Sequence, residues 1–186
     1  MEFMSKTTTV QQYELSNIQE NIEMVIYSLL CLSIPFAIGH PQFLVGTLVN
    51  AALILAALNL RDFKLLPVIM LPSIGVLMGG AIFGGFTMLL VYMIPFIWAA
   101  NALYVFVFKY FNLAQHLNSW LVVVIGSVVK MIFLFAFAFL FVKLGVLPSL
   151  FLTSMGLFQL YTALVGGALA LLVQSGKKLI SRRTTA

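Results

Sequence analysis

The sequence predicts an all-α integral membrane protein with six transmembrane helices in a compact bundle. Of its 186 residues, 62% are hydrophobic and only 8% are charged, whereas soluble domains carry about 25% charged residues. Apolar runs of about 20 residues, the length that crosses the ~30 Å hydrocarbon core of a bilayer as a helix, recur from residue 22 onward. The chain therefore has no room for a separate soluble domain.

Five short breaks separate the predicted helices: "GHPQ" (39–42), "NLRDFK" (59–64), "FGGF" (83–86), "KYFNLAQHLN" (109–118) and "KLGVLPS" (143–149). The helices are accordingly expected at about 22–39, 43–60, 65–85, 87–109, 119–142 and 149–174. The third break has only Gly84-Gly85 as a turn signal. Pro67, Pro72 and Pro95 are expected to interrupt the third and fourth helices.

The charges near the helix ends predict the orientation. A polar N-terminal segment (1–21) and a basic tail (175–186) flank the transmembrane domain (22–174), and lysine and arginine near span ends accumulate on the cytoplasmic side. With six spans, the other side receives only Lys143. Both termini are thus expected in the cytoplasm, with the protein in the cell membrane. The basic residues on the cytoplasmic side are Lys6, Arg61, Lys64, Lys109, Lys177, Lys178, Arg182 and Arg183.

Strongly polar side chains inside the apolar runs are the candidates for a site: Asn50, Asn101, Lys130 and Gln159. A rise of about 1.5 Å per residue places three of them in the middle to outer half of the membrane and Asn101 somewhat deeper. Each amide taken singly is expected to join helices by hydrogen bonds. Their similar depth also fits a shared solute pocket.

Lys130 lies in the stretch "IGSVVKMIFLF" (125–135), and no aspartate or glutamate is expected to be buried in any predicted helix, because Glu23 lies at the very start of the first one. A lysine at the centre of a membrane helix costs about 2.5–3.5 kcal/mol on insertion scales. Three arrangements would offset that cost. The lysine could be satisfied by internal hydrogen bonds or water, also in its neutral form, because buried lysines can lose their proton. It could instead face an anionic ligand in a wet pocket, or pair with an acid on a partner subunit.

Several function classes lack the residues they need. The sequence has no carboxylate pair, no nucleophile-and-base spacing and no GxxxxGK[ST] loop, so we expect neither enzymatic activity nor a cofactor. His40 and His116 have no second ligand at metal-binding spacing. The basic tail indicates an anchor at anionic lipid rather than a nucleic-acid site.

Small residues recur at four-residue spacing, which lets helix backbones approach closely in lipid. Internal packing is the expected role, and a docking face for another membrane subunit is the alternative. The pairs are Gly75 with Gly79, Gly80 with Gly84, Ser33 with Ala37, and Gly166 with Ala170.

Five segments together resemble the substrate-binding S-components of energy-coupling factor (ECF) transporters. They are "VGTLVNAALILAAL" (45–58), "VIMLPSIGVLMGG" (68–80), "MIPFIWAANALYVFVF" (93–108), "NSWLVVVIGSVVKMIFLF" (118–135) and "QLYTALVGGALALL" (159–172). The shared features are the order of VN, LPS and PF, followed by N, K and Q. The resemblance covers nearly the whole chain after residue 40.

The resemblance implies a compact six-helix protein that captures a small solute from the outer face, usually a vitamin or its precursor and in some relatives a metal ion. Such proteins dock on a transmembrane coupling subunit with two ATPase subunits and tilt to release their cargo. Family sites map here onto His40, Gly84, Gly85, Asn101, Lys130 and Gln159, to which the depth argument adds Asn50. The family's small docking residues map onto Ser33 and Ala37, although Pro35 between them departs from the pattern.

The sequence thus favours a solute-binding subunit of an ECF-type importer for a small polar or anionic solute. One alternative is a non-transporting scaffold or assembly subunit in which Lys130 pairs with a partner chain. A small secondary transporter is the other alternative.

Overall fold

The computed structural model describes residues 7–12 and 15–184, with side chains up to Lys177 in the last helix, and contains no strand in this part of the chain. The α-helices are α2 (Asn17–Ala37), α3 (Gln42–Asn59), α4 (Leu65–Gly79), α5 (Ile94–Phe108), α6 (Ser119–Lys143), α7 (Leu150–Met155) and α8 (Leu157–Thr184). The described chain also contains two 3-10 segments, η1 (Asp62–Lys64) and η2 (Gly84–Tyr92), and a π-helix, η3 (Lys109–Ala114).

Six helical segments of the described chain are long and apolar enough to cross a membrane, as the sequence predicted. They are Asn17–Ala37, Gln42–Asn59, Asp62–Gly79, Ile94–Ala114, Ser119–Lys143 and Leu150–Lys177. The expectation of an all-helical bundle with six long apolar helices is therefore confirmed for the described residues.

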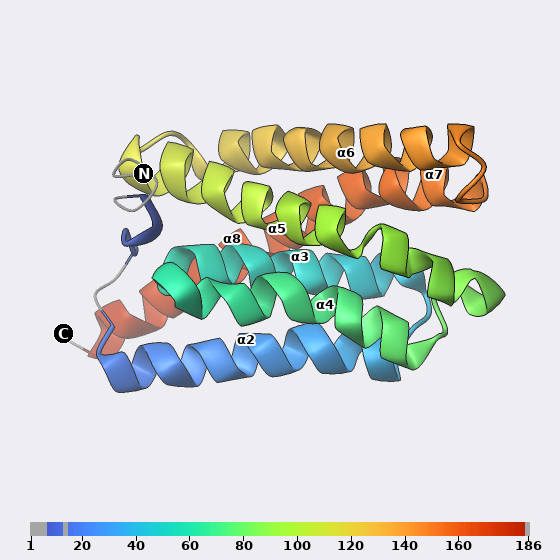
Figure 1. Cartoon of the computed structure of the whole chain (residues 1–186). Coiled ribbons are helices and arrows are strands. Elements are labelled where there is room, and N and C mark those ends of the chain that lie inside the picture. Colours follow the sequence, from blue (N-terminus) through green and yellow to red (C-terminus); the bar gives the residue numbers. More distant parts are fainter. Residues whose placement is uncertain (1–6, 13–14, 185–186) are drawn as a thin grey trace.

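The helices run side by side, with α3 in the interior of the bundle (Figure 1). This central helix packs against α2, α4, α5 and α8, while α6 packs against α5 and α8. Because the number of long helices is even, α2 begins and α8 ends at the same end of the bundle (Figure 1).

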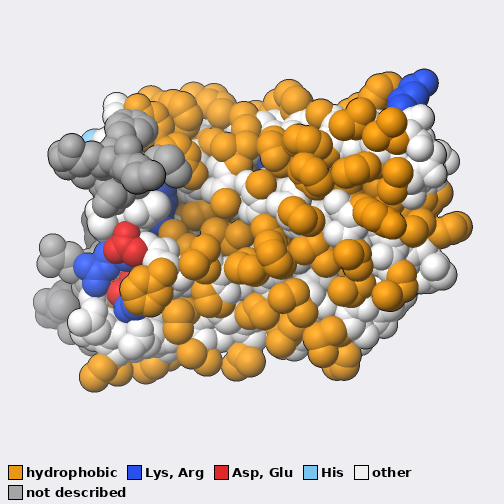
Figure 2. All heavy atoms as spheres, viewed as in Figure 1, with side chains coloured by type: hydrophobic (Ala, Val, Ile, Leu, Met, Phe, Trp, Pro, Cys, Tyr) orange, Lys and Arg blue, Asp and Glu red, His pale blue; other side chains and the backbone are white. Residues whose placement is uncertain are grey.

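The two ends of the bundle differ in charge. We call the end with Glu20, Arg61, Lys64, Lys109 and Lys177 the charged end, and the opposite end, with the connections 38–41, 80–93 and 144–149, the loop end. Apolar side chains cover the visible flank between them, and acidic side chains appear only at the charged end (Figure 2). Lys143 is the last residue of α6, at the loop end.

The expected boundary between the third and fourth helices is wrong. Helix α4 ends at Gly79 rather than 85, because Gly80 takes a left-handed conformation (φ 68°) and caps it. A turn and the 3-10 segment η2 follow, and α5 begins at Ile94 rather than 87. Pro95 does not interrupt this helix but lies in its first turn, where a missing N–H costs nothing.

Two other boundaries differ from expectation. Helix α2 begins at Asn17 rather than 22, because the side chains and backbones of Ser16 and Gln19 form a reciprocal capping box. The expected last helix is divided at Gly156 into α7 and α8. A Cβ at Gly156 would lie 2.9 Å from the Phe135 ring, so glycine lets this junction pack tightly on α6.

Small residues do mediate close helix packing inside the bundle. Gly75 and Gly79 lie against the backbone of α2, and a Cβ at Gly79 would come within 2.7 Å of the Phe36 carbonyl oxygen. Gly166 lies equally close to α3. In contrast, Gly80 and Gly84 have open space around them. These two glycines therefore serve their left-handed turns rather than a helix contact.

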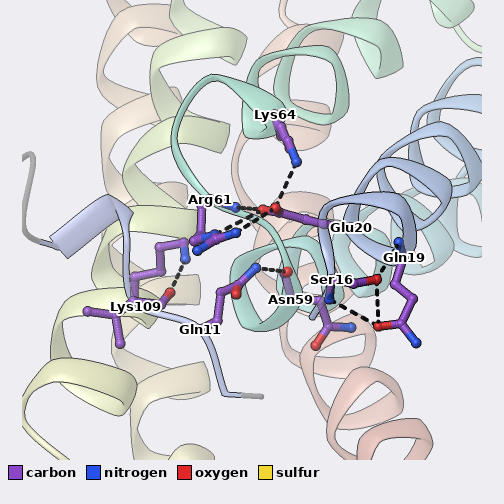
Figure 3. A network of polar contacts seen from close by, with 9 residues as sticks. Gln11, Ser16, Gln19, Glu20, Asn59, Arg61, Lys64 and Lys109 are labelled. Atoms are coloured by element: carbon purple, nitrogen blue, oxygen red, sulfur yellow. Dashed lines mark hydrogen bonds and ion pairs between the residues drawn. The ribbon is translucent and has the colours of Figure 1, made fainter. Parts of the chain in front are cut away.

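A polar network ties the charged end together (Figure 3). The buried Glu20 carboxylate on α2 accepts hydrogen bonds from the Arg61 backbone N–H at 2.7 Å and from Lys64 Nζ at 2.7 Å, and it also pairs with the Arg61 guanidinium at 3.1 Å. The start of α2 is thus fixed to the connection between α3 and α4.

The described part of the N-terminal segment folds across this same end. Gln12 donates its backbone N–H to Leu58 O at 2.9 Å and accepts from Gln174 Nε2 at 2.8 Å. The carbonyl of Val10 accepts from the buried Lys109. Residues 7–12 therefore connect α3, α5–η3 and α8. Residues 1–6 and 13–14, Lys6 and Glu14 included, lie outside the described part.

Candidate functional site

The four polar residues singled out from the sequence line one cavity. Asn50 comes from α3, Asn101 from α5, Lys130 from α6 and Gln159 from α8, and all four contribute to a cavity of about 90 Å³. The lining also includes Gln42, Ile82, Phe83 and Leu90, so the cavity lies toward the loop end. Side chains that are far apart in the sequence thus meet inside an otherwise apolar bundle.

Lys130 is the only charged side chain of this lining. Its side chain is 2% exposed, and Nζ donates a 2.6 Å hydrogen bond to Asn50 Oδ1. Nζ also lies 5.3 Å from the centre of the Tyr104 ring, within cation–π range. No salt bridge joins Lys130 to a carboxylate within the described residues. The cavity therefore carries one amino group that has no carboxylate partner among the described residues.

Asn50 holds Lys130 in place. Its Nδ2 group donates to Gly46 O at 2.9 Å and to Thr162 Oγ1 at 3.2 Å, while its Oδ1 accepts from Lys130. Thr162 in turn donates to Phe158 O at 2.7 Å. Both ends of the Asn50 amide are thus occupied by protein groups, which fix its orientation.

Asn101 belongs to a stripe of polar side chains on α5. Its Nδ2 donates to Ile69 O at 3.0 Å, and Trp98 Nε1 donates to Ser73 Oγ at 2.8 Å. Both acceptors lie on α4 close to Pro72, which has no N–H to continue the helical hydrogen bonds. The stripe therefore fastens α5 to the proline-containing part of α4.

Tyr104 completes this stripe. It is fully buried and donates to Ala163 O at 2.8 Å. A Cβ at Gly126 would lie 3.0 Å from the Tyr104 ring, and one at Gly167 would lie 3.1 Å from its hydroxyl. The two glycines on α6 and α8 thus make the space that brings the ring next to Lys130.

The remaining predicted site residues lie apart from the cavity lining. His40 is exposed, and its Nε2 lies 2.8 Å from Ala81 O, so it links the α2–α3 turn to the turn after α4. The turn itself contains a cis peptide bond between His40 and Pro41. Gly84 and Gly85 are exposed at the start of η2. Their backbone geometry shapes the connection next to Phe83, which does line the cavity.

The predicted docking residues lie on the flank of α2. Ser33 and Ala37 are exposed, and Ser33 donates its hydroxyl to Leu29 O of its own helix. Pro35 between them is buried and lines the cavity. Ser33 and Ala37 therefore face away from the candidate site.

Sequence reasoning missed several residues of the site. Tyr104 follows Asn101, and Thr162 follows Gln159, by three positions, which places each pair on one helix face. That spacing could have identified both residues. Ser73 and Gln42 also line the cavity, and no sequence signal distinguished them from other polar residues near helix ends and prolines.

Apolar residues near the loop end line part of the cavity. Ile82, Phe83 and Leu90 belong to the connection between α4 and α5, and Met155 belongs to α7. The Phe83 ring stacks on Phe151 of α7 with centroids 4.8 Å apart. Thr87 Oγ1 bonds to Gly80 O at 2.9 Å and to Gly84 O at 2.8 Å, which holds the connection in shape.

The lining offers charged, polar and apolar groups that could bind a small solute. In the part of the chain that the structure describes, no group of three histidine, cysteine or acidic side chains is placed to hold a metal ion. The lining supplies one ammonium group, several amides and hydroxyls, and a largely apolar wall. Such a set can hold and orient a small anion.

No family model, curated protein or solved structure matches this chain.

Proposed function

We propose that this protein is a multi-pass membrane subunit that binds a small polar or anionic solute in the cavity around Lys130. The observation that carries the proposal is the buried ammonium group at the wall of a cavity, without a carboxylate partner among the described residues. A buried charge needs a partner. A bound anion supplies that partner.

The orientation follows from the positive-inside rule. The charged end carries Arg61, Lys64, Lys109 and Lys177, and the loop end carries Lys143. We therefore place the charged end and both termini in the cytoplasm of a cell-membrane protein. In this orientation the cavity lies toward the outer face, from which the solute enters.

The burial of Lys130 supports a solute rather than a partner chain as the source of the counter-ion. Lys130 is enclosed by α3, α5 and α8 and is 2% exposed. An acidic residue on another subunit would have to enter the bundle to reach it. The scaffold alternative therefore needs a rearrangement that a small solute does not.

An ECF-type importer is the assembly that the sequence resemblance suggests. The subunit would then dock on a transmembrane coupling subunit served by two ATPase subunits. Ser33 and Ala37 lie exposed on α2, as a contact with such a partner requires.

Native mass spectrometry of the detergent-purified protein tests solute binding. We expect the wild-type protein to retain a small molecule that Lys130→Met has lost. Lys143→Met makes the same change at the exposed end of the same helix and should retain the molecule. A folded wild-type protein that neither copurifies with nor takes up any small anion would contradict the proposal.

A further inference from the structure

The charge of the cavity limits the charge of its ligand. Lys130 is the one ionisable side chain of the lining, and no aspartate or glutamate takes part in it. An ammonium group has three N–H donors, of which Asn50 Oδ1 accepts one. When protonated, Lys130 thus presents a single positive charge with two further N–H donors. A ligand with one negative charge balances it, whereas a second negative charge would have no partner.

Three of the other polar side chains of the cavity, Asn50, Ser73 and Thr162, are occupied by protein partners. The hydroxyls of Ser73 and Thr162 donate to Met70 O and Phe158 O, at 2.9 and 2.7 Å. Both ends of the Asn50 amide also have protein partners. The side-chain amides of Gln42 and Gln159 and the Oδ1 atom of Asn101 are left for a ligand. A ligand with more hydroxyl or amide groups than these can pair would bury the rest unpaired, at a cost for each one.

Most of the remaining wall is apolar. It is formed by side chains of α2, α3, α4, α5, α7 and α8 and of the connection 80–93, namely Pro35, Val45, Val49, Pro72, Val76, Ile82, Phe83, Leu90, Ile97, Met155 and Phe158. Such a wall favours a hydrocarbon chain, because the apolar surface of the chain is removed from water when the chain packs against it.

The size of the cavity limits the length of that chain. A volume of about 90 Å³ holds on the order of six to nine water-sized groups. A carboxylate with a short aliphatic chain, from butyrate to hexanoate, fills this space.

We propose that the cavity binds a short-chain aliphatic monocarboxylate, with its carboxylate on Lys130 Nζ and its chain against Val49, Val76 and Ile97. This assignment rests on the proposed function and specifies its solute class. Lys130 is the charge-recognition residue, and Asn50 is the positioning residue that orients it. The apolar wall selects the chain length.

Binding titrations with four matched probes test the assignment. The full-length protein in lipid nanodiscs is titrated with butyrate, butyramide, succinate and butylammonium. We expect butyrate to bind at least about tenfold more tightly than each of the other three, since only butyrate offers one negative charge and an apolar chain. Lys130→Met should remove the preference for butyrate over butyramide. Lys143→Met should keep it.

The apolar wall is tested separately with Ile97→Ala. This change enlarges the cavity without touching Lys130, so the preferred chain should become longer in the series from acetate to octanoate. Thermal unfolding of each variant establishes that it is folded. An unchanged preferred length in folded Ile97→Ala protein would overturn the placement of the chain.

The outcomes separate the solute class from the proposed function. Equal affinity for butyrate and butyramide, or tighter Lys130-dependent binding of succinate, would overturn the monocarboxylate assignment but leave a solute site. A different small molecule retained in native mass spectra and lost in Lys130→Met would do the same. If no probe binds and nothing copurifies with the folded protein, both the assignment and the proposed function fail.

Discussion

At the scale of single residues, the pair of Lys130 and Asn50 determines what the cavity can hold. The 2.6 Å hydrogen bond to Asn50 Oδ1 offsets part of the burial cost of the ammonium group but leaves its charge uncompensated. A neutral amide is the group that orients a lysine while leaving its charge available. An aspartate at the same position would neutralise it instead.

The replacement Asn50→Asp should therefore weaken anion binding strongly in a folded protein. The new carboxylate occupies the place of the amide and pairs with Lys130, so we expect the affinity for butyrate to fall by at least about tenfold. Binding titration measures the affinity, and thermal unfolding measures the stability. Wild-type affinity in the Asn50→Asp protein would contradict this role of Asn50.

Asn50→Leu is the matched comparison because it removes the amide without adding charge. It removes the acceptor of Lys130 Nζ and the side-chain hydrogen bonds to Gly46 O and Thr162 Oγ1. We expect a loss of about 1–3 kcal/mol in the free energy of unfolding, while folded protein keeps its preference for butyrate over butyramide. Loss of that preference in Asn50→Asp but not in Asn50→Leu would separate the charge of residue 50 from its packing.

At the scale of the elements, the cavity depends on close contact between α3 and α8. A Cβ at Gly166 would lie 2.5 Å from Thr47 O and 2.8 Å from Asn50 Cβ, so even a methyl group pushes α8 away from α3. We expect Gly166→Ala to destabilise the fold by about 1–3 kcal/mol and to weaken solute binding. Thermal unfolding and titration of the same sample measure both effects.

Gly176→Ala is the control on the same helix, because nothing lies within 4 Å of a Cβ at that position. Replacing a helical glycine by alanine in open space stabilises a helix by about 0.5–1 kcal/mol. Equal effects of the two replacements would show that helix propensity, and not the contact between α3 and α8, governs position 166.

A second element-scale contact fixes the start of α2. Glu20→Gln keeps the size of the side chain but removes the ion pairs with Arg61 and Lys64. The Arg61 side chain is 38% exposed. We therefore expect the free energy of unfolding to fall by about 1–3 kcal/mol, which is less than for a fully buried pair. Chemical unfolding measures it. Asp62→Asn, at an exposed position in the same connection, should change the stability by less than about 0.5 kcal/mol.

At the scale of the whole molecule, the lengths of the apolar runs were sufficient to predict six spans. The isolated polar residues within these runs were sufficient to predict four residues of the cavity lining, Asn50, Asn101, Lys130 and Gln159. The capping pattern of Ser16 and Gln19 was visible and would have placed the start of α2. The segment after Gly80 could not be placed, because a 3-10 segment of apolar residues has the same hydropathy as a helix. Periodicity also fails for α4 and α5, which are apolar nearly all round.

The last prediction concerns the orientation of the whole molecule in the membrane, which cysteine labelling tests. Phe63 at the charged end and Leu144 at the loop end are both exposed, whereas the native Cys31 is fully buried. We expect a membrane-impermeant maleimide to label Leu144→Cys in intact cells, and Phe63→Cys only after permeabilisation, because four of the described basic residues lie at the charged end. The unmodified protein, with Cys31 alone, is the control. The reverse pattern would place the cavity on the cytoplasmic side and turn the proposed uptake of solute into capture from inside the cell.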